Sequence, residues 1–322
     1  MTDEEIIIEL KREPARELRE LQAKPYEWKV KHAKDVVREF VEHEGGEEHV
    51  FVSFSGGKDS LVVLHIVRSL YPNVKAVFAN TGIEFPEQVK FVRTFENLVE
   101  LHPLKHFPQI IKDEGIVFPS KEVAMYVRDA KKGQKYATNG FKGLDPRGNP
   151  CRYKERLKKY EYLIDCGVKI SPDCCMLMKE KPVINLEKKT NSHSIIGTRA
   201  EESFRRAVGW MKSGCNSFKG QRHVSKPLSL WTEQDVLRYI VENKIQLSPM
   251  YGEIKKTDNK YYLTGCARTG CMFCPVPIAH GDLRNVEYAR IHYPKMYETF
   301  MIKFGLKEMI EKAQNKIQLS LF

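Results

Sequence analysis

The segment with the clearest chemical character is a short run of small and polar residues, Ser53-Phe54-Ser55-Gly56-Gly57-Lys58-Asp59-Ser60. It follows an apolar run over residues 49–54 that is typical of a buried strand, and it precedes helical spacing that begins near Leu61. Two glycines allow a tight turn and a close approach of ligand to backbone. Unpaired N–H groups at a helix start, one lysine and two serine hydroxyls suit an anion. The sequence therefore predicts a phosphate-binding loop, although its spacing is too short for a Walker A motif.

Eight cysteines form the second chemical feature, and four of them stand in two close pairs, Cys174-Cys175 and Cys271-x-x-Cys274. The C-x-x-C spacing is common in metal sites. In a reducing compartment such a set is more often metal-binding or catalytic than disulfide-forming. These residues are therefore candidate ligands of a metal centre, with Cys266 as an alternative ligand. Free thiols buried in the core are the competing interpretation.

The positive charge of the chain is concentrated in one window. The net charge is +11 and the isoelectric point is about 9.1, and residues 121–161 hold 12 Lys and Arg against 5 Asp and Glu. This excess suits a polyanionic partner or a phosphate-rich substrate, and a solvated lysine-rich surface explains it equally well. Aromatic residues that could stack on bases stand among the basic ones, which favours nucleic acid: Tyr126, Tyr136, Phe141, Tyr153 and Tyr160.

Alternating strand and helix patterns surround the loop. Strands are expected at residues 49–54, 75–79, near Leu101 and at 194–197, with helices between them, which predicts an α/β fold whose parallel sheet is flanked by helices. Thr232 and Asp235 read as a capping box that opens a further helix. Residues 1–45 read as helices broken at Pro14 and Pro25, and residues 285–313 as helical with a break near Pro294.

These patterns predict three regions: a helical N-terminal extension over 1–45, a nucleotide-binding α/β domain over 46–230, and a C-terminal helical region over 231–322. A basic insertion over about 120–170, rich in turn residues, would lie over the ligand-binding edge of the sheet. No apolar run approaches the ~18 residues that span a membrane. The acidic N-terminus does not read as a secretory signal, so a cytoplasmic protein without a membrane partner is expected.

The loop resembles the PP-loop of the N-type ATP pyrophosphatases, which cleave ATP between the α- and β-phosphates and activate an acceptor as its adenylate. Asn80-Thr81-Gly82-Ile83-Glu84-Phe85-Pro86 resembles the "DTG..FPE" turn of the phosphoadenylylsulfate (PAPS) reductase branch, with Asn80 in place of Asp. Residues 197–203 resemble its "G.RA.ES" segment, whose Arg faces the nucleotide. The implied ATP-binding residues are Ser53, Ser55, Gly56, Gly57, Lys58, Asp59, Ser60, Asn80, Thr81, Gly82, Gly197 and Arg199.

The same resemblance assigns catalytic roles to Lys58, Asp59 and Arg199. Lys58 and the loop amides would hold the leaving pyrophosphate, where negative charge accumulates as the α–β bond breaks. Mg²⁺ is expected to span the phosphates of ATP. Asp59 would help to position this ion, or it is simply an acidic residue at a helix start.

The cysteine pairs resemble the Cys-Cys…Cys-x-x-Cys set that holds a [4Fe–4S] cluster in adenylylsulfate (APS) reductases. Residues 174–182 resemble their "CC..RK..P" segment, with Met178 in place of Arg. Four thiolates satisfy the ligand count of such a cluster, so Cys174, Cys175, Cys271 and Cys274 are its expected ligands. A Cys₄ zinc site is the alternative occupant. Lys179 and Arg268 are expected near the cluster and the nucleotide.

Two departures from the sulfonucleotide reductases set the expected activity. Those enzymes carry a degraded loop and use a cysteine in a C-terminal tail as nucleophile, whereas this loop is intact and no cysteine follows Cys274. The resemblance is closest in character to DndC and SspD, proteins of DNA phosphorothioation, and some tRNA-thiolating enzymes share the combination. It implies an ATP pyrophosphatase that adenylates nucleic acid, DNA rather than tRNA, for sulfur transfer from a cysteine desulfurase. The alternatives are a reductase or adenylyltransferase of sulfate assimilation, and a nucleotide-binding module with little turnover.

The chain ends in Gln318-Leu319-Ser320-Leu321-Phe322. This segment resembles the QL[SD]LF peptide with which bacterial proteins dock on the DNA polymerase sliding clamp. A short peptide with leucine and phenylalanine anchors suits a hydrophobic pocket on a partner. A tail that folds back on its own core is the alternative. Docking on the clamp would favour DNA as the acceptor.

Overall fold

The computed structural model describes residues 3–266 and 268–319. Contacts between residues divide the chain into two compact units. The first unit contains the chain up to residue 79, residues 86–101 and residues 183–269, and the second contains residues 80–85, 102–182 and the chain from residue 270. These units follow spatial contacts rather than the three regions predicted from the sequence. The N-terminal helices, for example, belong to the unit that contains the sheet.

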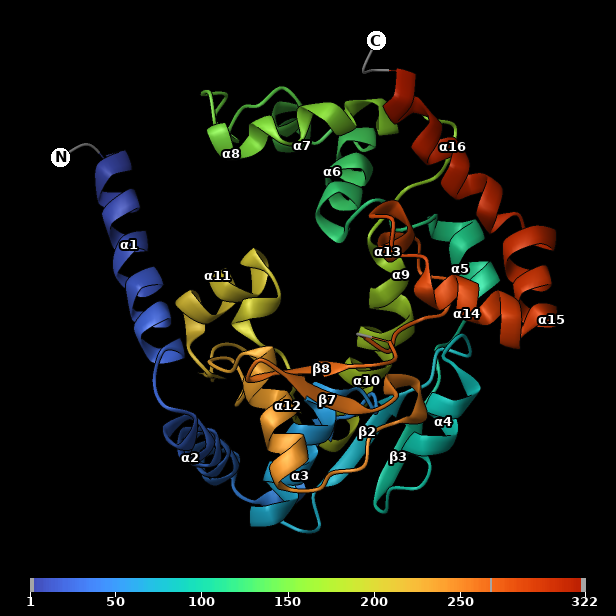
Figure 1. Ribbon diagram of the computed structural model, residues 1–322. Coiled ribbons are helices and arrows are strands. Elements are labelled where there is room, and N and C mark those ends of the chain that lie inside the picture. Colours follow the sequence, from blue (N-terminus) through green and yellow to red (C-terminus); the bar gives the residue numbers. More distant parts are fainter. Residues whose placement is uncertain (1–2, 267, 320–322) are drawn as a thin grey trace. The chain divides into compact units, whose positions relative to one another are not determined.

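A six-stranded sheet forms the centre of the first unit, with strand order β3-β2-β1-β4-β6-β5. All neighbouring strands are parallel except β5, which runs antiparallel to β6. Figure 1 shows β2 and β3 beside the helices of this unit. The prediction of a mostly parallel α/β sheet is confirmed. The strands are β1 (Val50–Ser53), β2 (Lys75–Ala79), β3 (Leu98–Leu101), β4 (His193–Ile196), β5 (Asn216–Ser217) and β6 (Val224–Ser225).

Alternating side chains of the strands build a core on each face of the sheet. Val52 and Phe78 join the main buried cluster, which includes Phe40 and Val63 from helices. Phe51 and Val77 point to the other face and pack with Val183 of α10. Burial of each such side chain stabilises the fold by about 1.5–3 kcal/mol. The helices are α1 (Asp3–Gln22), α2 (Tyr26–Glu44), α3 (Lys58–Leu70), α4 (Pro86–Val92), α10 (Lys181–Thr190), α11 (Phe204–Ser213) and α12 (Glu233–Glu242), and a hairpin, β7 (Ile254–Thr257) and β8 (Lys260–Leu263), follows them.

The second unit is mainly helical. Two of its helical stretches, Met176–Glu180 and Glu298–Lys303, have the wider π-helical turn. The predicted helical character of residues 285–313 and the break near Pro294 are confirmed. The α-helices are α5 (Phe107–Glu114), α6 (Lys121–Lys131), α7 (Lys135–Phe141), α8 (Arg152–Glu155), α9 (Asp173–Cys175), α13 (Pro275–Ala279), α14 (Arg284–His292), α15 (Pro294–Tyr297) and α16 (Leu306–Leu319).

Two details of the predicted pattern are wrong. Helix α1 continues through Pro14, because loss of one backbone hydrogen bond does not end a helix whose neighbours, such as Glu13 and Arg16, are good helix formers. Within the basic window, Tyr126 and Phe141 are buried. The mixture of Lys, Arg and aromatic residues there is partly an amphipathic helical pattern, since α6 buries Val123, Ala124 and Val127 on the same side as Tyr126.

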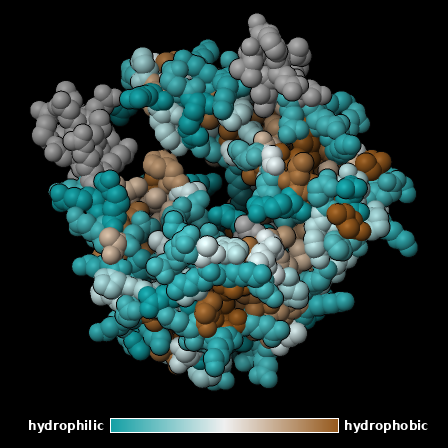
Figure 2. Space-filling view, viewed as in Figure 1, coloured by the Kyte–Doolittle hydropathy of each residue, from teal (hydrophilic) through white to brown (hydrophobic). Residues whose placement is uncertain are grey.

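The surface is mostly polar. Figure 2 shows hydrophilic residues over most of the visible face, interrupted by compact apolar areas. Within the described part of the chain, no helix is both long and apolar enough to cross a membrane. The predicted clamp-binding tail ends in Ser320–Phe322, which lie outside the described residues.

Candidate functional site

The predicted phosphate loop joins the end of β1 at Ser53 to the start of α3 at Lys58. Strand β1 lies between β2 and β4, so the chain leaves it on one side and later returns on the other. In open α/β sheets, ligands bind outside the carboxyl ends of strands at such a switch point. Gly56 has a φ of 69°, a backbone conformation that side chains other than glycine rarely adopt. The position of the loop in the sheet and its backbone conformation are therefore both typical of an anion-binding site.

Gly197 allows the end of β4 to approach the start of α3. A Cβ atom at this position would lie 2.8 Å from the backbone carbon of Asp59 and 2.8 Å from the nitrogen of Ser60. Only a residue without a side chain fits here, because backbone atoms cannot move aside as the end of a flexible side chain can. The predicted Gly197 is thus part of the same construction as the loop.

Internal hydrogen bonds fix the loop. The Ser55 N–H donates to Ser60 Oγ over 3.2 Å, and Ser60 Oγ donates to the carbonyl of Gly57 over 2.9 Å. Gln88 Nε2 donates to the carbonyl of Ser55 over 2.8 Å. At the start of α3, the Lys58 N–H donates over 3.0 Å to the hydroxyl of Tyr251. The loop is therefore held in place by the protein's own groups.

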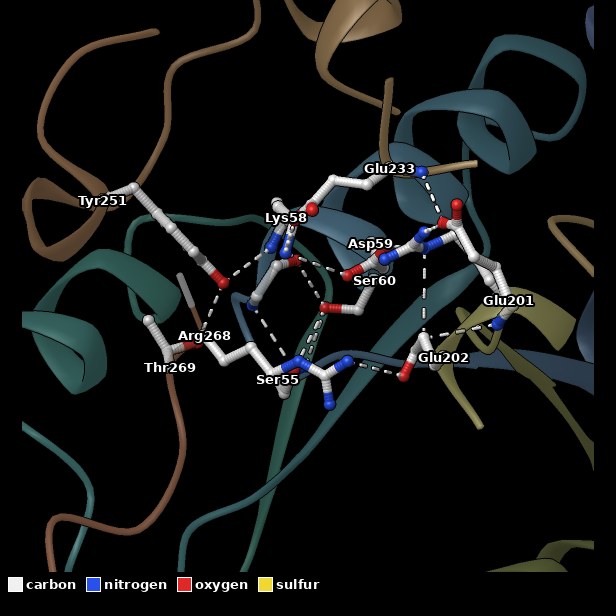
Figure 3. Close-up of polar contacts among 12 residues, drawn as sticks. Ser55, Lys58, Asp59, Ser60, Glu201, Glu202, Glu233, Tyr251, Arg268 and Thr269 are labelled. Carbon is white, nitrogen blue, oxygen red and sulfur yellow. Dashed lines mark hydrogen bonds and ion pairs between the residues drawn. The ribbon is translucent and has the colours of Figure 1, made fainter. Parts of the chain in front are cut away.

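Charged side chains surround the loop in alternating sign (Figure 3). Lys58 is only 2% exposed, and its Nζ lies 3.1 Å from Glu233 and 3.7 Å from Asp59. Arg199 is also buried, and its Nε donates to Asp59 Oδ1 over 2.5 Å. Its Nη1 donates to Glu201 over 2.6 Å. Asp59 is therefore engaged by two cations, and Arg199 is fixed by two carboxylates.

The loop opens into a cavity of about 310 Å³ within the first unit. Burial lowers the pKa of Arg206 below its ordinary value, and the nearby charge of Arg268 lowers it further. Both arginines pair with a single carboxylate, Glu202. An anion in the cavity would relieve the repulsion between them. The lining residues are Ser53, Ser55, Gly57, Lys58, Asp59, Ser60, Ile196, Gly197, Thr198, Glu202, Arg206, Tyr251, Arg268 and Thr269.

The structure brings together the predicted residues of the loop, Gly197 and Arg199, and adds others that sequence reasoning missed. Arg206, Tyr251 and Thr269 belong to the cavity. The Tyr251 hydroxyl also lies 3.1 Å from Thr269 Oγ1. No local sequence signal marks these residues, because they approach the loop from distant parts of the chain. Arg206 is the exception, since it stands three residues after the segment 197–203.

Asn80, Thr81 and Gly82 belong to the second unit. Asn80 Oδ1 accepts a hydrogen bond of 2.9 Å from the Gly82 N–H, which closes a tight turn. Glu84 Oε2 accepts from the Thr81 N–H over 2.9 Å and from its hydroxyl over 2.6 Å. These contacts give the turn a fixed shape, and they show the predicted Asn80 oxygen engaged with the backbone.

The four predicted cysteine ligands all belong to the second unit. Cys174 and Cys175 lie in α9, which continues directly into the π-helical turn Met176–Glu180. Such turns occur frequently at functional sites. Cys271 and Cys274 flank the buried Met272 and Phe273, and the Met272 N–H donates to the carbonyl of Ile83 over 2.9 Å. The two pairs are therefore held on well-packed backbone.

The surroundings of this group disfavour the charged form of its thiols. Burial raises the pKa of Cys274 to about 12, and the charge of Cys271 contributes to the rise. Burial also raises the pKa of Cys174 and of Cys271. Lys179 lies 3.3 Å from Glu84, and although burial opposes it, the negative charges of Cys271 and Glu84 raise its pKa. Partly buried thiols of this kind become thiolates when a metal binds them.

The distances between the cysteine sulfurs affect whether the group suits a zinc ion or an iron–sulfur cluster. Among the described residues, no three of the four sulfurs lie within 4.8 Å of one another. The sulfurs around one tetrahedral zinc ion stand about 3.8 Å apart, given Zn–S bonds of about 2.3 Å. A four-iron cluster is larger and separates its ligands more widely. Cys266, the alternative ligand, is buried and belongs to the first unit, whereas the other four cysteines belong to the second.

Arg268 and Lys179 are the two basic residues that were expected near the cluster and the nucleotide. Arg268 lines the cavity at the phosphate loop in the first unit. Lys179 interacts with Cys271 and Cys175 in the second unit. Arg268 therefore lies at the phosphate loop, and Lys179 lies at the cysteine group.

Comparison with known proteins places most of the chain within one family. The family model described as "Phosphoadenosine phosphosulfate reductase domain" matches residues 49–138 and 121–277. An uncharacterized protein of Methanocaldococcus jannaschii is 25% identical over 265 residues, which cover 80% of this chain and 48% of the relative. The chain thus spans about half the length of that relative. A 37.8 kDa uncharacterized protein of Escherichia phage 186 is 28% identical over 239 residues, 69% of this chain and 66% of the phage protein. The phosphoadenosine 5'-phosphosulfate reductase of Gloeobacter violaceus is 25% identical over 230 residues, 70% of this chain and 71% of the reductase.

Proposed function

The chain belongs to the phosphoadenosine phosphosulfate reductase domain family, and from this premise we propose that it is an ATP pyrophosphatase that adenylates an acceptor for sulfur transfer. The observation that carries the proposal is the intact phosphate loop. Gly56 has positive φ, α3 begins directly behind the loop, and the buried Lys58 stands at that start. This arrangement suits the two outer phosphates of a nucleoside triphosphate.

In the proposed reaction an acceptor oxygen attacks the α-phosphorus of ATP. The bond to the β-phosphate breaks, the acceptor becomes its adenylate, and pyrophosphate leaves. Lys58 and the amides at the start of α3 would stabilise the charge that builds up on the leaving pyrophosphate. Arg206 and Arg268, which both pair with Glu202, would bind the same group.

Asp59 and Arg199 would act as a pair in this proposal. Their contact of 2.5 Å fixes the guanidinium beside the first turn of α3, where the resemblance to the family expects it to face the nucleotide. Since Arg199 and Lys58 both engage Asp59, its carboxylate is better suited to orient Arg199 than to bind Mg²⁺ directly. Mg²⁺ would then reach the site with the phosphates of ATP.

The cysteine group would hold a [4Fe–4S] cluster through Cys174, Cys175, Cys271 and Cys274. The four cysteines belong to one unit and supply the ligand count of such a cluster. Such a cluster, when bound, supplies iron that can bind sulfur or transfer an electron. Lys179, beside Cys271 and Glu84, would balance the negative charge of the thiolates.

We propose nucleic acid, and DNA in preference to tRNA, as the acceptor. The support is the basic window, in which the exposed ring of Tyr153 lies beneath the Arg156 guanidinium, 4.2 Å from ring centroid to carbon. A cysteine desulfurase would deliver the sulfur as a persulfide, whose outer sulfur displaces AMP from the acceptor. A thiol reductant would then cleave the disulfide that links the acceptor to the desulfurase. The tail Gln318–Phe322 would dock on a sliding clamp, and its deletion is expected to abolish clamp binding while leaving pyrophosphate release intact.

The test is pyrophosphate release from ATP by the purified chain, measured with duplex DNA, with tRNA, with sulfate and without an acceptor. We expect equal amounts of AMP and pyrophosphate, with release stimulated by DNA. Stimulation by tRNA alone would move the acceptor to RNA, and stimulation by sulfate alone would indicate sulfate adenylylation. Absence of pyrophosphate release under all these conditions would refute the proposal.

Sulfonucleotide reduction is a second candidate function. It is favoured by the likeness to a protein named phosphoadenosine 5'-phosphosulfate reductase, at 25% identity over 70% of this chain. A reductase would form sulfite together with AMP or adenosine 3',5'-bisphosphate from a sulfonucleotide. Incubation of the chain with APS or PAPS and a thiol reductant, followed by sulfite assay, separates this activity from ATP cleavage.

A further inference from the structure

Three histidines surround one buried glutamate at the edge of the sheet opposite the phosphate loop. His43 and Glu44 lie in the last turn of α2. His193 begins β4, and His223 directly precedes β6, whose Val224 pairs with Ser194. The cluster is therefore at the amino ends of these parallel strands, whereas the loop follows the carboxyl end of β1. The reaction proposed above does not involve it.

Two imidazole nitrogens converge on a single carboxylate oxygen. His43 Nδ1 lies 3.1 Å from Glu44 Oε1, and His223 Nδ1 lies 2.9 Å from the same oxygen. One ligand atom from each of the three residues lies within 4.8 Å of the other two. With bonds of about 2.0–2.1 Å, ligands of a tetrahedral metal stand about 3.3 Å apart. The two contacts with Glu44, 3.1 and 2.9 Å, are already close to this spacing, and a metal ion would replace the shared protons.

His193 orients this carboxylate. Its Nδ1 accepts the backbone N–H of His223 over 3.3 Å, so in the neutral ring the proton is on Nε2. That Nε2 lies 3.3 Å from Glu44 Oε2. His193 thus holds one oxygen of Glu44 and leaves the other to face His43 and His223, as outer residues do around bound metals.

The buried negative charge of Glu44 favours the binding of a positive ion beside it. Its side chain is 6% exposed, and within the described part of the chain its ion-pair partners are the three histidines, with no Lys or Arg among them. A buried carboxylate is costly unless a positive charge or hydrogen bonds compensate it. The Phe218 ring stacks on His43 at 3.9 Å between centroids and adds an apolar wall to the site.

We propose that His43, Glu44 and His223 bind a divalent transition-metal ion, with His193 as a positioning residue. Two imidazole nitrogens and one carboxylate oxygen are a common ligand set for zinc and for ferrous iron, and they leave further positions for water. Because the ligands come from α2 and from the strand β6 region, the ion would join the N-terminal helices to the sheet. Metal binding of this kind stabilises a fold.

The test uses Co²⁺ as a spectroscopic probe on the purified full chain. Cobalt at this site is expected to give a visible d–d spectrum without a sulfur-to-cobalt charge-transfer band, which distinguishes it from cobalt bound by the cysteines. Titration of this absorbance gives the affinity for Co²⁺. His43→Gln and His223→Asn should each lower that affinity at least about tenfold, and His193→Gln should lower it about tenfold. His280→Asn, which changes an exposed histidine outside the cluster, is the matched control and should leave the signal unchanged.

Thermal unfolding gives an independent reading. Co²⁺ or Zn²⁺ should raise the Tm of the native chain and of His280→Asn, and the rise should shrink or vanish in His223→Asn. If a histidine variant fails to fold, as judged by circular dichroism, Glu44→Gln keeps the shape of the side chain and replaces it in both measurements. A cobalt spectrum that arises only from thiolates, or one that persists unchanged in these variants, overturns the proposal. The cluster would then be a hydrogen-bonded group only.

Discussion

The phosphate loop and the cysteine group reach their geometry in different ways. In the loop, adjacent residues and backbone groups satisfy one another, as in the bond from Ser60 Oγ to the Gly57 carbonyl. In the cysteine group, residues almost a hundred positions apart meet as partly buried thiols whose pKa is raised. The first arrangement is satisfied by the protein's own groups, whereas in the second burial disfavours the charged form of the thiols. We therefore expect the loop to be preformed and the cysteine group to gain stability when it is loaded.

The largest expected effect is on the loop. Lys58→Met should slow pyrophosphate release from ATP by about 10²–10³-fold, because it removes the charge that faces the leaving group. The iron content should not change, since Lys58 belongs to the first unit and the cysteines to the second. Rates are measured at saturating ATP. Lys75→Met, an exposed lysine of the same unit, is the control and should keep the native rate. A Lys58→Met enzyme with native activity would remove the loop from the mechanism.

The second prediction changes the cysteine group and asks whether the phosphate loop is affected. Cys271→Ser should lower iron and acid-labile sulfide after anaerobic purification by about tenfold or more, because three thiolates hold a cluster poorly. The affinity for ATP should stay within about threefold of the native value, as expected if the two sites act independently. Cys215→Ser, outside the group of four, is the control and should retain iron. Equal loss of ATP affinity and iron would contradict the idea that the loop is preformed.

The strands, the loop and the helix starts were predictable from the sequence because their signals are local. The capping box of Thr232 and Asp235, for example, forms as predicted at the start of α12. The wall of the cavity was not predictable. The hydroxyl that receives the Lys58 N–H comes from Tyr251, 193 positions along the chain, and its contact depends on how the helices pack. Similarly, spacing alone could not tell that Tyr126 belongs to the core while Tyr153 is exposed.

The third prediction concerns the close approach behind the loop. Gly197→Ala should lower the free energy of unfolding by about 1–3 kcal/mol, because its Cβ would lie 2.8 Å from the backbone of Asp59. Chemical denaturation measures the change. Gly209→Ala is the matched control, since a Cβ there meets no atom within 4 Å and α11 should gain up to about 1 kcal/mol from alanine. A neutral Gly197→Ala would mean that the loop tolerates displacement and is not rigid.

The smallest effect is expected at the rim of the cavity. Arg206 and Arg268 repel each other and both pair with Glu202. Each of them should therefore contribute to the affinity for an anion. Arg206→Met should weaken ATP or pyrophosphate binding about tenfold, the equivalent of about 1.4 kcal/mol for one charge-assisted hydrogen bond. Arg205→Met, the exposed neighbour, is the control, and titration calorimetry gives both affinities. Because Arg206 is half-exposed, salt should weaken its contribution, whereas the contribution of the buried Lys58 should persist. If Arg206→Met binds as tightly as the native chain at low salt, Glu202 already satisfies Arg206, and the anion is held by the loop alone.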